Sequence, residues 1–427
     1  MEILRLEPVR AVAGVVQVPG SKSLTNRVVL LAGIAVGVTQ VDNVLVADDT
    51  SRMLDALAHL GVETRRPPNA TSLEIAGVGG PFRVRHADLF LGNAGTAMRP
   101  LTAMLTTGAG SFTLRGDPRM HERPIGPLVD ALAALGAHIE YLAIAGYPPL
   151  RIDAAGLDGG EVHIDGSVSS QFTSALLLAA PLARGRSLIH TVNDPVSLPY
   201  VSMTIDVMKR FGIDVQFAGE SSYLVEGGQT YRSPGRISIE GDWSSASYFL
   251  AAGAIRGGTV RVAGLERNTS QGDVKFLDAL RDMGAFTRRG DDWVEVSRGT
   301  LHGIDVDARD FPDAAMTLAT TALFATGPTS IRGIGNWRIK ETDRLAAMAT
   351  ELRKVGATVV EGAGDLHITP PDRLTSAVID TYGDHRMAMA FSLAALGDVP
   401  QVIRNPGVTS KTYPAYFDDF RRISQTR

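Results

Sequence analysis

The stretch Gly92-Asn93-Ala94-Gly95-Thr96-Ala97-Met98-Arg99-Pro100 decides how the rest of the chain is interpreted. It follows the short apolar run 89–91 and precedes the apolar segment 101–105, an order that predicts a strand, a tight glycine turn and a helix start. Its two glycines let the backbone approach a ligand, the helix N-terminus offers N–H groups, and Arg99 adds a positive charge. The stretch therefore predicts a site for a small anion, although a glycine turn before a helix can also be purely structural.

Composition limits the classes of protein to consider. The chain has 427 residues, more than a single hydrophobic core usually organises, so two domains are expected. With 42 basic and 46 acidic residues there is no basic excess for nucleic acid or an anionic membrane, so any anion site depends on locally placed residues. The absence of cysteine excludes disulfides and thiolate nucleophiles. No apolar run is long enough to cross a bilayer and no signal-peptide pattern is seen, so we expect a cytoplasmic protein.

Internal repeats organise the whole sequence. Apolar helix-like segments ending at a glycine recur at intervals of 70 to 77 residues, at Gly37, Gly108, Gly185, Gly257, Gly327 and Gly397. Between them lie amphipathic segments of the type Leu-x-x-x-Leu-Gly-Ala, each running into a short β-like stretch. One repeat has the approximate element order α-β-α-β-β, and it occurs six times. The glycine-ended helices are apolar nearly all round, which predicts that they are buried.

The sixth repeat lacks sequence for its last strand, and the run 2–18 can supply it. This predicts a discontinuous domain. We expect one lobe at residues 21–240, which holds repeats one to three. We expect a second lobe from 1–20 together with 241–427, with repeats four to six and an active site in the cleft between the lobes. Pro-Gly pairs at Pro19-Gly20 and Pro234-Gly235 mark the expected crossings.

In each repeat, charged and polar residues that a purely structural role would not need stand just before a predicted helix start. If the helices of one lobe run in the same direction, their N-termini meet on one face, where lysines and arginines would make an anion site. For single residues a structural interpretation stays open, because serines are ordinary N-cap residues; this applies to Ser169, Ser170, Ser244 and Ser245. Asp384-His385-Arg386 is harder to explain structurally, since ionisable groups rarely enter a buried segment without partners.

Histidines outside this motif, His163 and His190 among them, are scattered singly and are interpreted as surface or packing residues. No histidine pair has the spacing of a zinc-protease motif, and no acidic run resembles a calcium loop. We therefore expect neither a protein-bound metal nor a cofactor.

Six motifs along the chain together resemble those of the 5-enolpyruvylshikimate-3-phosphate (EPSP) synthases, a group of enolpyruvyl transferases. They are Pro19-Gly20-Ser21-Lys22-Ser23, the Leu91–Pro100 stretch, Gly166-Ser167-Val168-Ser169-Ser170-Gln171, Pro312-Asp313-Ala314-Ala315, Asn336-Trp337-Arg338-Ile339-Lys340-Glu341-Thr342-Asp343-Arg344 and Gly383-Asp384-His385-Arg386-Met387. The resemblance implies an α/β fold, the inside-out α/β barrel of two domains with six βαβαββ-type repeats, three per domain. It also implies transfer of the enolpyruvyl group of phosphoenolpyruvate to the 5-hydroxyl of shikimate 3-phosphate, a step towards aromatic amino acids.

Site residues are carried over from these motifs. The resemblance implies that shikimate 3-phosphate is bound by Lys22, Ser23, Arg27, Ser169, Ser170, Gln171, Ser197, Tyr200, Asp313, Asn336 and Lys340. It implies that phosphoenolpyruvate is bound by Lys22, Asn93, Gly95, Arg123, Gln171, Arg344, Arg386 and Lys411. The implied catalytic residues are Asp313, Glu341, Lys22 and His385; Glu341 would exchange a proton with carbon, and either Asp313 or Lys22 would take the hydroxyl proton.

Two other functions were weighed against this one. Enolpyruvyl transferases that act on UDP-N-acetylglucosamine typically have asparagine after the first lysine and a cysteine in a mobile loop, whereas this chain has Ser23 and no cysteine. A non-catalytic protein that captures phosphorylated metabolites would gain nothing from Glu341 and Asp313 beside its cationic groups. The Gly95 loop also resembles that of glyphosate-sensitive enzymes, and the family suggests a monomer that binds neither nucleic acid nor membrane.

Overall fold

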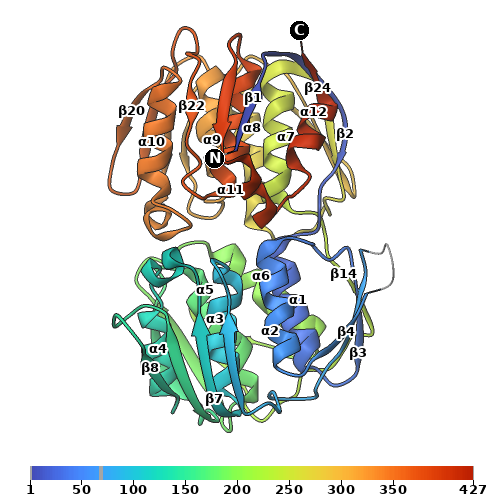
Figure 1. The fold of residues 1–427 in the computed structure, drawn as a ribbon, viewed down its shortest axis with the longest axis vertical. Coiled ribbons are helices and arrows are strands. Elements are labelled where there is room, and N and C mark those ends of the chain that lie inside the picture. The colour runs from blue at the N-terminus through green and yellow to red at the C-terminus, as the bar shows by residue number, and fades with distance from the viewer. Residues whose placement is uncertain (1, 67–70, 427) are drawn as a thin grey trace. The chain divides into compact units, whose positions relative to one another are not determined.

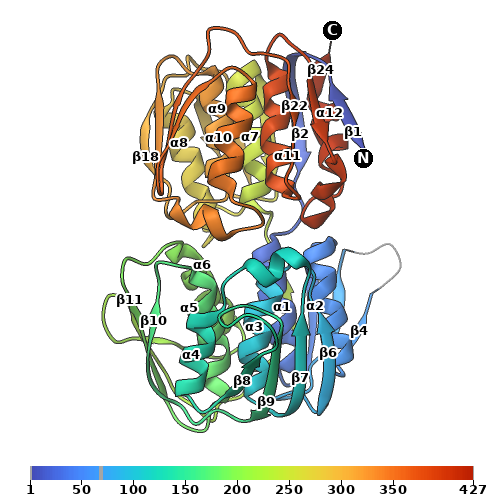
Figure 2. The ribbon, with the colours of Figure 1, turned by 60° about the vertical axis from the view of Figure 1, so that its left-hand side comes forward.

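The structure, a computed structural model, describes residues 2–66 and 71–426. The chain divides into two compact units: unit 1 comprises Met1–Pro19 and Glu240–Arg427, and unit 2 comprises Gly20–Ile239. Each unit has its own hydrophobic core and three small sheets. Figures 1 and 2 show the two units from two sides. Among the described residues, none of the helices combines the length and the apolar character needed to cross a membrane.

Unit 2 consists of three copies of one βαβαββ arrangement. In each copy two strands are parallel, a buried helix precedes the second of them, an outer helix follows it, and a closing hairpin pairs antiparallel with this second strand. In the first copy the other parallel strand, β14, comes from the end of the unit. The first copy is β14 (Arg236–Ser238), α1 (Lys22–Ile34), β3 (Val38–Asp42), α2 (Asp48–His59), β4 (Glu63–Arg65) and β5 (Leu73–Ala76). The second is β6 (His86–Phe90), α3 (Gly95–Thr106), β7 (Ala109–Arg115), α4 (Gly126–Ala134), β8 (His138–Tyr141) and β9 (Leu150–Ala155). The third is β10 (Gly160–Asp165), α5 (Ser170–Ala179), β11 (Ser187–Val192), α6 (Leu198–Arg210), β12 (Gln216–Phe217) and β13 (Ser222–Val225).

Unit 1 repeats the arrangement three more times. Its first copy is β2 (Val9–Gln17), α7 (Trp243–Arg256), β15 (Gly257–Ala263), α8 (Phe276–Asp282), β16 (Phe286–Arg289) and β17 (Trp293–Ser297). The second is β18 (Asp305–Asp307), α9 (Ala315–Thr321), β19 (Thr329–Arg332), α10 (Arg344–Lys354), β20 (Thr358–Glu361) and β21 (Leu366–Thr369). The third is β22 (Val378–Ile379), α11 (His385–Ser392), β23 (Gln401–Arg404) and α12 (Tyr416–Ile423), and the single strand β1 (Ile3–Leu6) takes the place of its closing hairpin. The last strand, β24 (Ser424–Thr426), joins the sheet of the first copy by pairing with β2. Short 3₁₀ turns complete the chain: η1 (Pro118–Glu122), η2 (Ala180–Leu182), η3 (Gly272–Lys275), η4 (Ala322–Phe324), η5 (Gly335–Ile339), η6 (Leu393–Leu396) and η7 (Pro406–Lys411).

The N-terminal segment completes the sheets of unit 1. Strand β1 (Ile3–Leu6) pairs antiparallel with β23, and β2 pairs parallel with β15 and antiparallel with β24. Residues from the two ends of the sequence therefore share sheets. The predicted α/β class and its six βαβαββ-type repeats are confirmed.

The helix between the parallel strands of each repeat is almost wholly buried, as its all-round apolar pattern predicts. In unit 1 every residue of α9 and α11 is buried, and in α7 only Arg256 is not. Figure 1 shows these three helices grouped in the interior of unit 1. The outer helices each keep a polar face; in α2, for example, Ser51 and Asp55 are exposed. Because the interior is made of helices and the sheets lie outside them, side chains at helix ends are the ones that reach solvent.

Candidate active site

In unit 2 each buried helix leaves one residue unburied, and it is the second residue of the helix. These residues are Ser23 in α1, Thr96 in α3 and Gln171 in α5. The starts of the helices lie close together: Asn26 Nδ2 donates to Thr96 Oγ1 over 2.7 Å, and a methyl group on Gly95 would come within 3.1 Å of Gln171 Oε1. Unit 2 is thus open to solvent where three helix N-termini, with their positive dipole ends, converge.

The first turns of α1 and α3 keep their N–H groups available. Within the described residues, neither helix has a hydrogen bond from its N-cap side chain, whereas Ser169 caps α5 by accepting from Gln171 N over 3.2 Å. Ser170 is buried in the same turn. Uncapped helix N-termini leave several donors for an anion.

The guanidinium of Arg27, on α1, forms hydrogen bonds with residues of α5 and α6. Its guanidinium donates from Nε to Thr204 Oγ1 over 2.7 Å, and from its terminal nitrogens to the carbonyls of Ser23 and Tyr200 over 3.0 and 3.2 Å. Burial lowers the pKa of Arg27 to about 10, which leaves it charged at neutral pH. Ser197, buried at the N-cap of α6, has a left-handed backbone with φ of 58°. These bonds hold a buried positive charge next to the partly exposed Ser23.

Arg123 and Gly95 are packed against each other. Arg123 Nη1 donates to both the carbonyl and the side-chain oxygen of Asn93, over 3.0 and 2.8 Å, so the guanidinium is fixed beside the glycine turn. A methyl group at Gly95 would lie 2.7 Å from Arg123 Nη2 and 3.1 Å from Arg99 Nη1. Arg123 is 4% exposed, and its buried Nε has no hydrogen-bond partner among the described residues. A side chain at position 95 would therefore have to displace the guanidinium of Arg123 and crowd that of Arg99.

Lys22, the first residue of α1, has a counterion from α2. Its Nζ lies 3.3 Å from Asp49 Oδ2, and the two side chains are 10% and 4% exposed. A lysine at a helix N-terminus opposes the helix dipole, so its placement costs free energy unless an anion is near. Asp49 supplies that anion in the unliganded chain.

In unit 1 the predicted residues form a buried network of ion pairs, which we call the unit 1 cluster: Asp313, Glu341, Arg344, Asp384 and Arg386. Arg344 Nε donates to Asp384 Oδ2 over 2.7 Å, Nη1 to Asp313 Oδ1 over 2.9 Å, and Nη2 to Glu341 Oε2 over 2.8 Å. Burial alone lowers the pKa of Arg344, but the carboxylates of Asp384, Glu341 and Asp313 outweigh it and raise this pKa. One planar guanidinium thus fixes the positions of three carboxylates.

Arg386 is the second cation of the cluster. Its Nη2 donates to Asp313 Oδ2 over 2.7 Å, so Asp313 bridges the two arginines. Asp384 caps α11 by accepting from Arg386 N over 2.9 Å. The buried Nε of Arg386 has no hydrogen-bond partner among the described residues. The cluster therefore keeps a guanidinium donor that no group in the described part of the chain uses.

Sequence reasoning missed one neighbour of this cluster. Asp273 is 3% exposed, accepts from the backbone N of Ala314 over 3.1 Å and accepts from the hydroxyl of Ser244. Burial, reinforced by the charge of Asp313, raises the pKa of Asp273 to about 6. Asn26, which joins α1 to α3 in unit 2, was missed as well. Sequence reasoning missed Asp273 and Asn26 because their hydrogen-bond partners are far away in the sequence.

The structure corrects one detail and places the remaining residues. Helix α7 is capped by Asp242, whose Oδ2 accepts from Ser245 N over 2.9 Å, so the N-cap interpretation of Ser244 and Ser245 is wrong. It is also wrong for Ser170, because the N-cap of α5 is Ser169. Asn336 and Lys411 are buried, and Lys340 is partly exposed beside Glu341. His385 is fully buried, with Nδ1 3.3 Å from Asp384 Oδ1. The ring of His385 thus contacts the Asp384 carboxylate from within the core.

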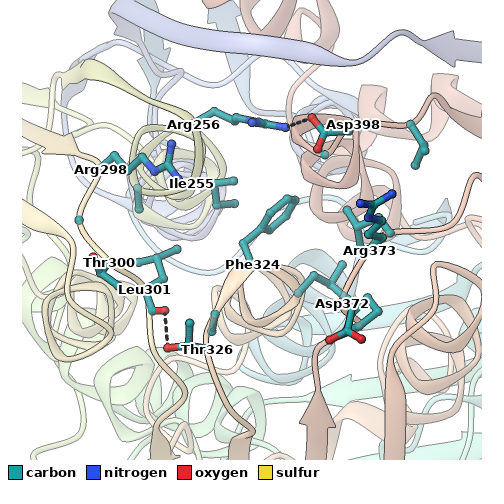
Figure 3. A pocket seen from close by; sticks show the side chains of 18 residues that line it. Ile255, Arg256, Arg298, Thr300, Leu301, Phe324, Thr326, Asp372, Arg373 and Asp398 are labelled. Atoms are coloured by element: carbon teal, nitrogen blue, oxygen red, sulfur yellow. Dashed lines mark hydrogen bonds and ion pairs between the residues drawn. The ribbon is translucent and has the colours of Figure 1, made fainter.

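A cavity of about 910 Å³ lies at the other ends of the same buried helices of unit 1. Figure 3 shows Arg256, Arg298 and Arg373 around it, with Phe324 projecting into its centre and Arg256 paired with Asp398. Residues Arg256, Phe324 and Gly397 stand at or just after the C-terminal ends of α7, η4 and η6. The cavity is therefore separate from the unit 1 cluster at the helix N-termini.

Comparison with known proteins identifies the fold and then the family. The enolpyruvyl transferase NikO of Streptomyces tendae superimposes with a TM-score of 0.81 at 19% identity, covering 100% of this chain and 98% of NikO. The EPSP synthase of Acinetobacter baumannii superimposes with a TM-score of 0.83 at 26% identity, covering 99% of this chain and 98% of that one. The fold is that of the enolpyruvyl transferases.

Sequence similarity is more specific. The family model for EPSP synthase (3-phosphoshikimate 1-carboxyvinyltransferase) matches residues 6–420. A 3-phosphoshikimate 1-carboxyvinyltransferase of Marinomonas sp. (strain MWYL1) is 54% identical over 424 residues, covering 99% of this chain and 100% of that protein. One from Yersinia pestis bv. Antiqua (strain Angola) is 56% identical over 426 residues, covering 100% and 99%. The chain belongs to the EPSP synthase family.

Proposed function

We propose that this chain transfers the enolpyruvyl group of phosphoenolpyruvate to the 5-hydroxyl of shikimate 3-phosphate and releases phosphate. Family membership supports the choice of reaction. The observation that carries it is the bonding of Glu341 and Asp313 to Arg344, because carboxylates that move protons stand beside a cation that binds carboxylate or phosphate. Both substrates are phosphorylated carboxylates.

Unit 2 is proposed to bind anions at its converging helix N-termini. Ser23, Ser169, Ser170, Gln171, Ser197 and Tyr200 would hold shikimate 3-phosphate together with Lys22 and Arg27. Asn93 and Gly95 would shape the phosphoenolpyruvate site, to which Arg123 contributes its unused Nε–H. Rigid guanidiniums suit this task because their planar donors pair with carboxylate and phosphate oxygens.

Unit 1 is proposed to supply the proton chemistry. In the addition step the 5-oxygen bonds to C2 of phosphoenolpyruvate while Glu341 gives a proton to the methylene carbon, and Asp313 or Lys22 takes the hydroxyl proton. In the elimination step the new methyl group returns a proton to Glu341 as the bond from C2 to the phosphate oxygen breaks. Arg344, Arg386 and Lys411 would stabilise the charge that shifts to phosphate.

The remaining residues have supporting roles in this proposal. Asn336 and Lys340 would bind shikimate 3-phosphate from unit 1. His385 is fully buried behind Asp384, so we assign it a positioning role in place of direct proton transfer. We also propose that the enzyme is cytoplasmic and monomeric. Light scattering of the purified chain would test the monomeric state.

Phosphate release from phosphoenolpyruvate tests the proposal. Release should require shikimate 3-phosphate, should not occur with UDP-N-acetylglucosamine, and should fall at least 100-fold in Glu341→Ala, since a general acid–base group contributes about 100- to 10,000-fold. The matched control is Glu361→Ala. It removes a carboxylate on β20 whose Oε1 lies 3.1 Å from Arg338 Nη2, and it should retain activity.

Two results would overturn the assignment. Binding of both substrates without any phosphate release would identify a binding protein. Release that depends on UDP-N-acetylglucosamine would identify the other acceptor.

A further inference from the structure

Three potential metal ligands meet on the outward face of the third sheet of unit 2. Burial alternates along β10, so Glu161 and His163 both point to solvent while Val162 and Ile164 point into the core. In the parallel register between β10 and β11, His163 lies directly opposite His190. Their rings stack with centroids 4.7 Å apart, the distance between neighbouring strands. Histidines that look isolated in sequence are therefore adjacent in the fold.

The ligand atoms are already close to the spacing that a metal ion needs. One atom each of Glu161, His163 and His190 lies within 4.8 Å of the other two. His190 Nε2 lies 3.2 Å from Glu161 Oε1. Zinc bonds to nitrogen and oxygen are about 2.0–2.2 Å long, so tetrahedral ligand atoms stand roughly 3.3–3.5 Å apart. Two ligands thus need almost no movement, and only the exposed ring of His163 has to turn.

A further hydrogen bond orients His190. Ser222, opposite it on β13, places Oγ 2.8 Å from His190 Nδ1. A hydroxyl both donates and accepts, so Ser222 can pair with either tautomer of the ring. When Nε2 of the neutral ring binds a metal ion, the single ring proton is on Nδ1 and is donated to Ser222 Oγ. Such outer hydrogen bonds fix the tautomer and the ring direction of metal-binding histidines.

The geometry points to a divalent transition-metal site at Glu161, His163 and His190, with zinc as the fitting ion and water completing the coordination. Imidazole and carboxylate are ligands that zinc accepts, and three protein ligands with an open position are common at zinc sites. Over residues 2–66 and 71–426 this is the one group of three such side chains within that distance. The ion would join β10, the edge strand of its sheet, to β11.

The chain contains its own matched control in unit 1. His367 on β21 has Nε2 3.1 Å from Asp365 Oδ2 and Nδ1 2.7 Å from Ser330 Oγ. This repeats the carboxylate, imidazole and serine of the proposed site without a second imidazole. Since the chain has no cysteine, thiolates add no background binding. A single histidine–carboxylate pair should bind zinc far more weakly than the chelating group.

Calorimetric titration of the full chain with zinc chloride, in a phosphate-free buffer without substrates, tests the site. We expect one ion per chain, an affinity at least 10-fold lower in His163→Ala and in His190→Ala, and about 10-fold lower in Ser222→Ala. His367→Ala should bind like the parent. Circular dichroism without metal establishes that each variant is folded, and Glu161→Gln offers a milder change should an alanine variant fail to fold.

A zinc-soaked crystal locates the ion independently. An anomalous scattering peak between Glu161, His163 and His190 is expected. Unchanged affinity in both histidine variants, binding lost only in His367→Ala, or no saturable binding by the parent would each overturn the site. The measurement uses no catalytic turnover, so failure here leaves the proposed reaction untouched.

Discussion

Arg344 Nε lies 2.7 Å from Asp384 Oδ2, and the two side chains are 1% and 0% exposed. Asp384 also caps α11, so the position of Arg344 is tied to the start of a buried helix. Breaking a buried ion pair typically costs about 3–5 kcal/mol, because the remaining charge stays buried without its partner. The unit 1 cluster is therefore expected to be sensitive even to substitutions that conserve charge.

Arg344→Lys tests this expectation. A lysine ammonium keeps the charge but has no planar fork to reach Asp384, Asp313 and Glu341 together. We expect kcat/KM to fall at least 100-fold, about 2.7 kcal/mol, with a lower melting temperature. Steady-state kinetics and calorimetry measure both. Arg332→Lys, at the exposed pair with Asp305, should change kcat/KM less than 2-fold; equal losses in both variants would contradict the special role of the cluster.

The pH dependence of stability should reveal Asp273. Burial and the charge of Asp313 raise its pKa to about 6 in the folded chain, above its ordinary value near 4. The folded state therefore holds this proton more tightly than the unfolded state does, and ionising Asp273 costs stability as pH rises from about 4 to about 6. In Asp273→Asn that loss is removed. Relative to the parent, the variant should gain roughly 2–3 kcal/mol of unfolding free energy between pH 4 and 7.

Urea unfolding at several pH values measures this difference. Asp291→Asn is the control, because its carboxylate is 96% exposed and its removal should leave the pH profile of the parent unchanged. A difference between Asp273→Asn and the parent that stays constant with pH would show that folding does not raise the pKa of Asp273.

Gly95→Ala should weaken phosphoenolpyruvate binding selectively. The added methyl group would stand 2.7 Å from Arg123 Nη2, so this guanidinium has to move. Under the proposed function we expect KM for phosphoenolpyruvate to rise about 10-fold or more, glyphosate inhibition to weaken further, and the Kd of shikimate 3-phosphate to stay within 2-fold. Competition kinetics and calorimetry supply the three values. Equal weakening of both substrates would indicate a general distortion of unit 2, and failure of glyphosate to compete in the parent would remove the inhibitor from the proposal.

Asp49→Asn should change stability and binding in opposite directions. Without the Asp49 carboxylate, Lys22 loses the anion 3.3 Å from its Nζ in the free chain, so the melting temperature should fall. The same change removes a negative charge that competes with the substrate phosphate for Lys22. We expect shikimate 3-phosphate to bind about 5-fold more tightly, a gain of about 1 kcal/mol. Weaker binding together with lower stability would show that Asp49 is needed to position Lys22.

Periodicity and glycine spacing predicted the repeats because the burial of a helix determines which residue types its own sequence contains. All of α9 and α11 is buried, and apart from His385 and Arg386 at the start of α11 their residues are apolar or are serine and threonine. Contacts between distant residues leave no such record. Asp273 and Ala314 are 41 positions apart, and Asn26 and Thr96 are 70 apart, so a single sequence does not pair them. The same reason hid the neighbouring rings of His163 and His190, which only the parallel register of β10 and β11 reveals.

Residue types alone also misassigned one helix start. Ser244 and Ser245 have good capping chemistry, but Asp242 precedes them and its carboxylate accepts from Ser245 N. Ser244 is then available to bond Asp273 inside the core. The choice between these caps depends on where the chain turns into α7, which is set by packing against the rest of unit 1 and not by local preference.

The pairing of β2 with both β15 and β24 has a consequence for how the protein is made. On the ribosome, unit 2 can close its last sheet once β14 has emerged, because all its strands are contiguous in the chain. The first strands synthesised, β1 and β2, must wait for partners made much later. A chain that stops before β23 would leave β1 without its partner and β2 with an open edge, and open strand edges promote aggregation. Premature termination should therefore yield insoluble protein even when unit 2 is intact.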